Sequence, residues 1–324
     1  MTKTAVPAGF ELHWCQFETA SLSDAVVANY HHWSAEQLAD ALAHGQVKVN
    51  GEVVSAERQL MPADKVSLLL PQHQEGETDC QWKLLWKNPE LMAVHKPARL
   101  PVSRTTRNLF HTLISLVRRA TEYKDAHLLH RLDAETSGLI LLANYSHADK
   151  KWKKRLDRLL ERKIYHALVW GNPDWDEQEF SCYLAEKTDS RIRTQMHVVA
   201  ADESGCVKSP KLATTRFRVL QRSAGFSLLE CELFTGRKHQ IRAQLAYLGH
   251  AIIGDKIYSL DGQYYLKRLG QDLTAEDYAQ LGAEHHLLHA YQLQLNTGQE
   301  QLTVTDEFYP PAWLDYLERL PDRG

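Results

Sequence analysis

The segment from His130 to Gly138 places a carboxylate, Asp133, among polar residues between two apolar runs. Leu128 and Leu129 precede it and 139–143 follow it, and such runs predict buried strands joined by an exposed, tight connection. Loops held by rigid elements often carry chemistry. Asp133 in such a loop can serve as a nucleophile, as a general base or as the cap of a following turn. From this segment alone, a cap or a surface ion pair is the simplest interpretation.

A second polar cluster, 235–242, directly follows the apolar-rich segment 227–234. A strand that ends in Thr-Gly and leads into a helix exposes free backbone N–H donors, which favours anion binding. Arg237 and Lys238 can contact phosphates there. Arg242 can do the same, or it can turn inward to a carboxylate as a bidentate partner.

Two further segments supply an aromatic residue and positive charge. Residues 162–171 alternate like a half-buried strand, so Lys163 and Tyr165 should share one face; the alternative for Tyr165 is a core aromatic whose hydroxyl finds a partner. Residues 148–163 read as a strongly basic helix that includes Lys150 and Lys154. A positive patch and an ordinary solvated helix face both fit that helix.

Composition limits the class of protein. The chain has 324 residues, 44% hydrophobic and 24% charged, with a net charge of -3, so affinity for a polyanion must come from local basic patches. Its five cysteines form no Cys-x-x-Cys pair, which argues against a disulfide framework or a thiolate zinc site and favours a reducing cytoplasm. No apolar run approaches the roughly 18 residues of a membrane span, and no signal sequence is evident.

The order of predicted elements suggests two domains, 1–75 and 76–324, joined by a polar linker at 72–79. Residues 34–45 carry a capping box and a terminal Gly that predict a helix. Asn50-Gly51 between two β-rich runs predicts a hairpin over 47–54, and 65–70 predicts another strand. From residue 82 onward, strands with scattered helices predict an α+β fold on a central, mainly antiparallel sheet.

The helix, hairpin and strand at 20–71 resemble the S-four-type (alpha-L) RNA-binding module. The first helix of this region, 20–30, lacks the Arg and Lys residues that usually contact phosphates in that module. A small α+β appendage without a ligand is the alternative.

Four ordered segments of the larger domain resemble the RluA family of RNA pseudouridine synthases. They are LLHRLDAETSGLILLA at 128–143, RKIYHALVWG at 162–171, TGRKHQIRAQLAYLGHAIIGDKIY at 235–258 and LLHAYQL at 287–293. The resemblance implies an α+β catalytic domain with an RNA-binding cleft. It also implies isomerisation of uridine to pseudouridine in ribosomal or transfer RNA, without a metal or an organic cofactor.

The resemblance also implies roles for single residues. Asp133 corresponds to the catalytic carboxylate, and Arg131 to the residue that fills the space of the flipped nucleotide. Tyr165 would stack on the flipped base and could also assist removal of the proton from its C5, and Arg242 would pair with Asp133. Residues expected to contact RNA phosphates are Lys163, Arg237, Lys238, Lys150 and Lys154.

Two positions depart from the family pattern. Arg99 stands where the family usually has Gly, so the backbone conformation is expected to differ there, and Gln244 replaces a usual His. His285, His286 and His289 form one histidine cluster whose i, i+4 spacing would suit a metal on a helix. The family resemblance implies a strand near the cleft for this segment, which favours no metal.

Two rival functions stay open on the sequence alone. One is an RNA-binding protein without activity, against which Asp133, Tyr165 and Arg242 argue. The other is a glycoside hydrolase that uses Asp133 and Glu135, although carboxylates two residues apart on one loop rarely face each other across a bond. We expect a monomer, and we expect target choice to depend on loops at 188–209 and 261–284.

Overall fold

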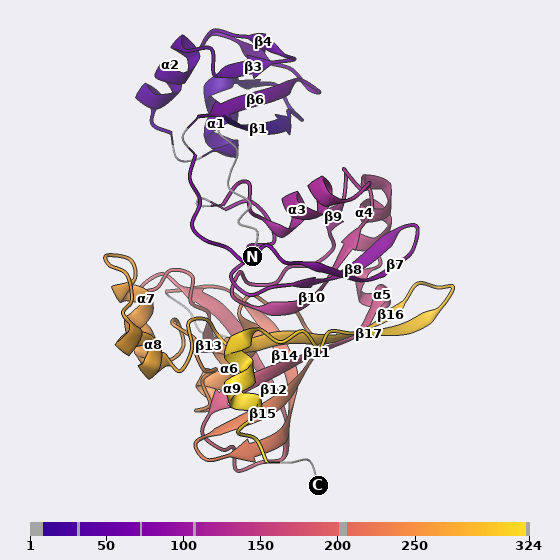
Figure 1. Ribbon diagram of the computed structural model, residues 1–324, viewed down its shortest axis with the longest axis vertical. Helices are drawn as coiled ribbons and strands as arrows, with labels where there is room; N and C mark the ends of the chain where they lie inside the picture. The colour runs from indigo at the N-terminus through magenta and orange to yellow at the C-terminus, as the bar shows by residue number, and fades with distance from the viewer. Residues whose placement is uncertain (1–8, 31–32, 72, 106–107, 201–205, 322–324) are drawn as a thin grey trace. The chain divides into compact units, whose positions relative to one another are not determined.

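The computed structural model describes residues 9–30, 33–71, 73–105, 108–200 and 206–321 (Figure 1). The chain forms two compact units: the first comprises 1–78 together with 103–116, and the second comprises 79–102 together with 117–324. The segment 103–116 lies beyond the predicted boundary at residue 75 but belongs to the first unit. The predicted linker starts at Gln72, which lies outside the described residues, and 73–79 form neither helix nor strand.

The first unit is a small α+β structure with a four-stranded sheet in the order β1-β6-β3-β4 and a two-stranded sheet of β2 and β5. Its elements are β1 (Phe10–Cys15), β2 (Ala20–Ser21), α1 (Leu22–Asn29), α2 (Ala35–Ala43), β3 (Val47–Val49), β4 (Glu52–Val53), β5 (Gln59–Leu60) and β6 (Lys65–Leu70).

Local signals in the sequence account for this unit. Ser34 caps α2 through a reciprocal pair of hydrogen bonds with Gln37, which confirms the predicted capping box. Asn50 and Gly51 both have positive φ, 54° and 89°, as a type I′ hairpin turn requires. The predicted helix, hairpin and strand therefore all form.

A carboxylate ties the segment 103–116 into the first unit. Glu75 accepts hydrogen bonds from three successive backbone N–H groups, those of Leu109, Phe110 and His111, at 2.6 to 2.8 Å. The Leu109 side chain joins the apolar core of this unit. Burial would raise the pKa of Glu75, but these donors lower it, so the carboxylate is charged.

The second unit is built on one eleven-stranded sheet. Nine strands follow the order β13-β12-β14-β15-β11-β16-β10-β8-β7, while β17 pairs with β16 and β9 with β10. The strands are β7 (Lys83–Lys87), β8 (Leu91–Lys96), β9 (His127–Leu128), β10 (Ser137–Ala143), β11 (Leu160–Trp170), β12 (Glu177–Lys187), β13 (His197–Val199), β14 (Val207–Ser223), β15 (Phe226–Leu233), β16 (Leu288–Asn296) and β17 (Gln301–Thr305).

Short helices complete the fold. They are α3 (Leu113–Ala120), which spans a boundary between the units, and, within the second unit, α4 (Ser146–Lys153), α5 (Leu156–Leu159), α6 (Gln240–Tyr247), the 3-10 helix η1 (Leu260–Gly262), α7 (Gln263–Lys267), α8 (Ala275–Leu281) and α9 (Pro311–Leu317). Figure 1 shows α7 and α8 together at one side of the second unit. The segment 261–284, predicted as a loop, is therefore largely helical.

The predicted basic helix over 148–163 is wrong. The helix α4 ends at Lys153, the single turn α5 follows, and β11 begins at Leu160. Ile164 to Val169 are buried between β15 and β16, so pairing in the sheet overrides the helical character of the charged residues before them.

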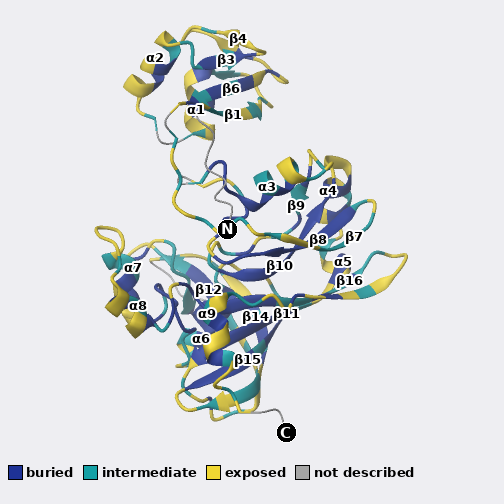
Figure 2. Cartoon of the chain, viewed as in Figure 1, coloured by how far each residue is buried: buried dark blue, intermediate teal, exposed yellow. Residues whose placement is uncertain are grey.

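The centre of the sheet consists of β11, β16 and β10. All seven residues of β10 are buried, as Figure 2 shows by the dark colour of this strand. β10 runs parallel to β16, whereas the other strand pairs are antiparallel. The prediction of an α+β fold with a mainly antiparallel sheet is thus confirmed, with one parallel pair at the middle. The loop before β10 and one face of β11 therefore lie close together.

Candidate active site

Asp133 lies in the loop that enters β10. Its carbonyl accepts a hydrogen bond from the backbone N–H of Thr136 at 3.2 Å, which closes a turn, and a strand rather than a helix follows. Asp133 is therefore not a helix cap. Its side chain is 33% exposed and meets the buried guanidinium of Arg242, so the alternative of a surface ion pair is also wrong.

Arg242 holds two carboxylates at once. Its Nη1 donates to Oδ2 of Asp133 at 2.7 Å, while its Nε and Nη2 donate to the two oxygens of Asp255 at 2.7 and 2.9 Å. Burial would lower the pKa of Arg242, but the charges of Asp255 and Asp133 raise it well above its usual value. The guanidinium is therefore a fixed cation between two anions.

The ion pair with Arg242 keeps Asp133 ionised. Burial would raise the pKa of this carboxyl, but Arg242, with help from His239 and His286, lowers it to about 2. At neutral pH, Asp133 is an anion that is partly open to solvent and held at one oxygen. Such a group can attack an electrophile or accept a proton.

Asp255 anchors Arg242 from behind. Its side chain is fully buried, and Oδ1 also accepts the backbone N–H groups of Ile257 and Tyr258 at 3.0 and 3.1 Å. Burial would raise the pKa of Asp255, but Arg242 lowers it. Because its acceptor sites are filled, Asp255 orients the guanidinium toward Asp133.

Tyr165 lies on β11, where it pairs with Cys231 of β15 and Ala290 of β16. Its side chain is buried, and its hydroxyl makes no hydrogen bond to the residues that the structure describes. Burial and the nearby charge of Asp133 raise its pKa far above the usual value, so the phenol stays protonated at neutral pH. This favours an apolar stacking surface over a general base.

One pocket brings these groups together. It is lined by Arg131, Leu132, Asp133, Thr136, Tyr165, Leu233, Arg237, His239, Gln240, Ile241, Arg242 and Leu288. All three predicted catalytic residues lie in it, together with two of the predicted RNA contacts.

Gly138 allows the strands beneath this pocket to approach closely. Its φ is 106°, and a Cβ at this position would collide with the backbone of Ala290 on β16. Only glycine fits both the conformation and the space. The parallel β10–β16 contact therefore depends on the glycine that ends the Asp133 loop.

Comparisons with known proteins identify the family of this chain. A family model described as RNA pseudouridylate synthase matches residues 90–247. The dual-specificity RNA pseudouridine synthase RluA of Vibrio cholerae is 31% identical over 177 residues, which cover 54% of this chain and 68% of the relative. The chain belongs to the RluA family of RNA pseudouridine synthases.

Other relatives of this RluA-family chain agree. The ribosomal large subunit pseudouridine synthase D of Nitrosomonas europaea is 26% identical over 282 residues, covering 85% of this chain and 76% of the relative. The solved structure of human RNA pseudouridylate synthase domain containing 1 matches with a TM-score of 0.57 and 22% identity, covering 75% of this chain and 89% of that one. That structure supports the fold.

The basic residues predicted to contact RNA are spread over the second unit. Arg131 and Arg237 line the pocket, whereas Lys150 and Lys154 on and after α4 do not. Lys238 forms an ion pair with Glu186 at 2.7 Å. Burial, together with the charge of Arg237, lowers the pKa of Lys163. Its Nζ lies beside Gly236, the residue before Arg237.

A buried lysine supports the Asp133 loop. Nζ of Lys96 donates to the carbonyls of Pro97, Leu100 and Ala134 at 2.8 to 2.9 Å, and Ala134 directly follows Asp133. Burial lowers the pKa of Lys96 to about 7, although Asp133 and Glu135 oppose this change. The sequence analysis assigned no role to this residue.

The histidine cluster supports the same loop. His286 and His289 bond the hydroxyls of Thr136 and Ser137 at 2.7 and 2.8 Å. His289 lies on β16, so the helical spacing considered for a metal does not occur. Within the described part of the chain, no group of three or more His, Cys, Asp and Glu residues is placed to hold a metal.

The other carboxylate of the loop is held apart from Asp133. Glu135 forms ion pairs with Lys256 at 3.0 Å and Arg268 at 3.4 Å. Both ion pairs engage the Glu135 carboxylate with cations rather than with Asp133, which argues against the glycosidase alternative, in which the two carboxylates work together.

Both departures from the family pattern are accommodated. Arg99 has a φ of 67°, the left-handed region that glycine favours, at a cost of about 1–2 kcal/mol. Buried Gln244 accepts a hydrogen bond from Thr215 at 2.6 Å and donates to the carbonyl of Ala213 at 3.2 Å, so it fastens α6 to β14. Neither change removes a group from the pocket.

Sequence reasoning missed Asp255, although it stands directly after the apolar run 251–253 and Gly254. A carboxylate that follows a buried run is a signal for a buried partner. Its partner is 13 residues away on α6, so only the fold identifies Arg242.

None of the described helices has the length and apolar character to cross a membrane.

Proposed function

We propose that this protein isomerises uridine to pseudouridine in structured RNA, ribosomal or transfer RNA, with Asp133 as the catalytic residue. The observation that carries the proposal is the single pocket in which Asp133, Tyr165 and Arg242 meet. The family membership supports the reaction, and the ionised state of Asp133 supports the role of this residue.

The reaction requires an anion at the ribose. The bond between C1′ and N1 must break, the uracil must turn, a bond from C1′ to C5 must form, and the proton on C5 must leave. Asp133 either attacks C1′ or removes a proton from C2′ to give a glycal, and both routes need a charged carboxylate. A pKa of about 2 keeps it charged at neutral pH.

The detached base must stay in the pocket while it turns. A nucleotide on which such chemistry occurs leaves its stack and enters an enclosed site. Tyr165 offers an aromatic face there, and its protonated hydroxyl is not a competing nucleophile. In this proposal Arg131, exposed at the same pocket, fills the space that the flipped nucleotide leaves.

In this proposal Arg237, Lys163 and Lys238 bind RNA phosphates. Lys150 and Lys154 bind phosphates further along the RNA backbone. Such contacts release counterions, so affinity should fall as salt rises. The Lys238–Glu186 pair is on the surface, and a phosphate can replace the carboxylate at small cost.

The decisive test is Asp133→Asn, assayed with unmodified transcripts of ribosomal and transfer RNA. Arg242 keeps both hydrogen bonds to Asp255, so the variant should fold and bind RNA. Pseudouridine formation should fall at least about 10³-fold. We also propose that the reaction needs no metal, so pseudouridine formation by the wild type should be unaffected by a chelator.

Two results would contradict the proposal. One is a wild-type protein that forms no pseudouridine on any of these RNAs. The other is a variant as active as the wild type.

For the first unit we propose an RNA-binding role as an S-four-like module over residues 1–75. Deleting 1–75 is a poor test, because Leu109 would lose its apolar neighbours. Replacing Lys48 and Lys65 of β3 and β6 with Gln should instead weaken RNA binding by about 10-fold. Unchanged affinity would favour an appendage without a ligand.

We also propose that the protein acts as a monomer in the cytoplasm. Its five cysteines are all free thiols, which suits a reducing compartment. Light scattering after gel filtration should give the mass of one chain.

A further inference from the structure

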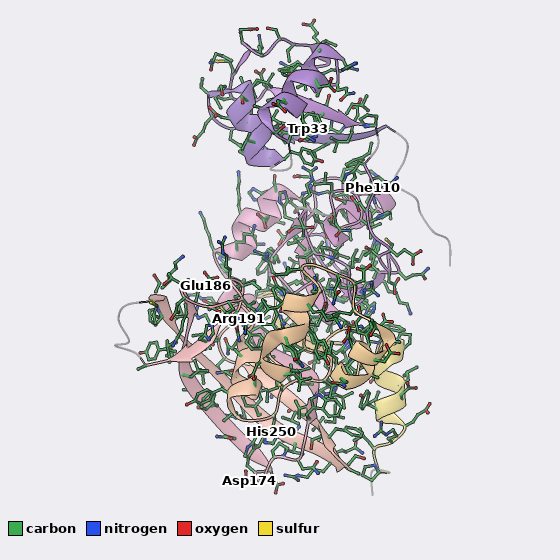
Figure 3. The ribbon with its side chains drawn as sticks, turned by 90° about the vertical axis from the view of Figure 1, so that its left-hand side faces the viewer. Trp33, Phe110, Asp174, Glu186, Arg191 and His250 are labelled. Atoms are coloured by element: carbon green, nitrogen blue, oxygen red, sulfur yellow. The ribbon has the colours of Figure 1, made fainter. Side chains whose placement is uncertain are left out.

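The loop between β12 and β13, residues 188–196, carries two exposed arginines. Arg191, labelled in Figure 3, and Arg193 flank Ile192, a residue that is only 3% exposed. Neither guanidinium makes a hydrogen bond or an ion pair with the described residues. The guanidinium groups on either side of the buried Ile192 are therefore available to bind an anion.

The backbone of the 188–196 loop is held by its own hydrogen bonds. Ser190 Oγ donates to the carbonyl of Ile192 at 3.1 Å and accepts its N–H at 3.3 Å, and the N–H of Gln195 donates to the same carbonyl at 3.0 Å. The Ile192 side chain also packs on Gly262, where any Cβ would collide with it. The arginines are therefore presented from a fixed turn, which lowers the entropy cost of binding.

The 188–196 loop is attached to the pocket through Tyr258. The N–H of Met196 donates to the Tyr258 hydroxyl at 2.8 Å, and the same oxygen lies 3.1 Å from Nδ1 of the pocket residue His239. The Tyr258 ring lies against the Arg242 guanidinium, 5.2 Å from its centre. The two arginines therefore sit on a loop that is only one side chain away from the groups that surround Asp133.

Charge near the loop favours an anionic ligand. Glu186 near the end of β12 and its ion-pair partner Lys238 together add no net charge beside the loop. Asp189 is the one carboxylate within 188–196, against Arg191 and Arg193. The loop therefore carries a net positive charge beside a pocket that already contains Arg131 and Arg237.

We infer that Arg191 and Arg193 bind backbone phosphates of the RNA strand that flanks the flipped uridine. This inference rests on the proposed function, which supplies RNA as the ligand. A planar guanidinium matches two phosphate oxygens, so arginines on a fixed turn set the position of the strand as well as its affinity. The contact carries no base information by itself.

The test compares the double variant R191Q/R193Q with a control, K83Q/K124Q, which removes two exposed charges elsewhere in the second unit. The probe is a fluorescein-labelled transcript that forms a stem-loop with uridines in the loop and single-stranded flanks. Binding is measured over a series of salt concentrations. R191Q/R193Q should bind about 10-fold more weakly at low salt, and the slope of log K against log salt should fall by about 1.5 to 2.

The control should change affinity by less than about 2-fold. Turnover of R191Q/R193Q at saturating RNA should stay near the wild-type value, because Asp133, Tyr165 and Arg242 are untouched. The inference fails if the two double variants weaken RNA binding equally or if R191Q/R193Q binds RNA like the wild type. It also fails if R191Q/R193Q loses turnover without losing RNA affinity. A wild type without pseudouridine activity would refute the proposed function, while the affinity comparison would still decide the role of the two arginines.

Discussion

At the scale of single residues, the site consists of three charged groups, Asp255, Arg242 and Asp133, that hold one another in position by hydrogen bonds. Asp255 is buried and holds Arg242 by two hydrogen bonds, and Arg242 in turn holds Asp133 at the pocket by one. A lone buried carboxylate would take up a proton, whereas Arg242 keeps Asp133 charged, and no hydrogen bond from the described residues reaches its other oxygen. Arg242 therefore acts through position as well as charge.

Arg242→Lys separates these two contributions. An ammonium keeps the charge but cannot serve both carboxylates with a planar fork, so Asp133 should lose its orientation. At pH 7 we expect kcat to fall about 10² -fold with little change in RNA affinity. Rates measured from pH 5 to 8 should fall by the same factor throughout, because Asp133 is ionised over this range. An activity loss that vanished at high pH would mean that charge alone matters.

At the scale of elements, the site depends on β11, β16 and β10 lying side by side. β16 comes last of the three in the chain but pairs with both others, in parallel with β10 and antiparallel with β11. His289 on β16 and His286 just before this strand hold the Asp133 loop through Ser137 and Thr136. The loop is therefore positioned by a strand that lies about 150 residues further along the chain.

Gly138→Ala tests this arrangement. The added Cβ meets the backbone of Ala290, so the strands must separate, and we expect a loss of at least about 3 kcal/mol in the free energy of unfolding. Gly298→Ala is the matched control, because Gly298 also has a positive φ, 81°, but open space around it. It should cost only about 1 kcal/mol. Equal losses in urea denaturation would show that backbone conformation, not the close contact, requires Gly138.

At the scale of the whole molecule, burial lowers the pKa of five histidines among the described residues of the second unit. Burial is the first cause in each case, and it lowers the pKa to about 4 for His130, His239, His285 and His289, and well below its usual value for His286. Several of them support the Asp133 loop. The stability of the unit is therefore linked to pH.

Stability should fall as the pH is lowered from 7 to 5. Below about pH 6.5 the unfolded chain binds protons at these histidines but the folded chain does not, so the stability present above pH 6.5 is lost toward pH 4. Asp133 and Asp255 add a further loss only below about pH 4. The urea midpoint should drop clearly between pH 7 and 5, and an unchanged midpoint over this range would contradict the folded-state pKa values.

The sequence alone determined the α+β class, the helix at 34–45, the hairpin and the strand at 65–70 of the first unit, and five of the residues that meet in the pocket: Arg131, Asp133, Tyr165, Arg237 and Arg242. Periodicity, caps and turn residues act locally, and the motifs carry the family pattern. Only the tertiary structure decided that β11 starts at Leu160, that 103–116 belongs to the first unit, and that Asp255 holds Arg242. These depend on partners distant in the chain, and local propensities do not encode which strand or side chain a residue will meet. The loop around Asp133 illustrates both. The sequence indicates its residues, but Arg242 keeps Asp133 charged, and Lys96 and β16 set the position of the loop.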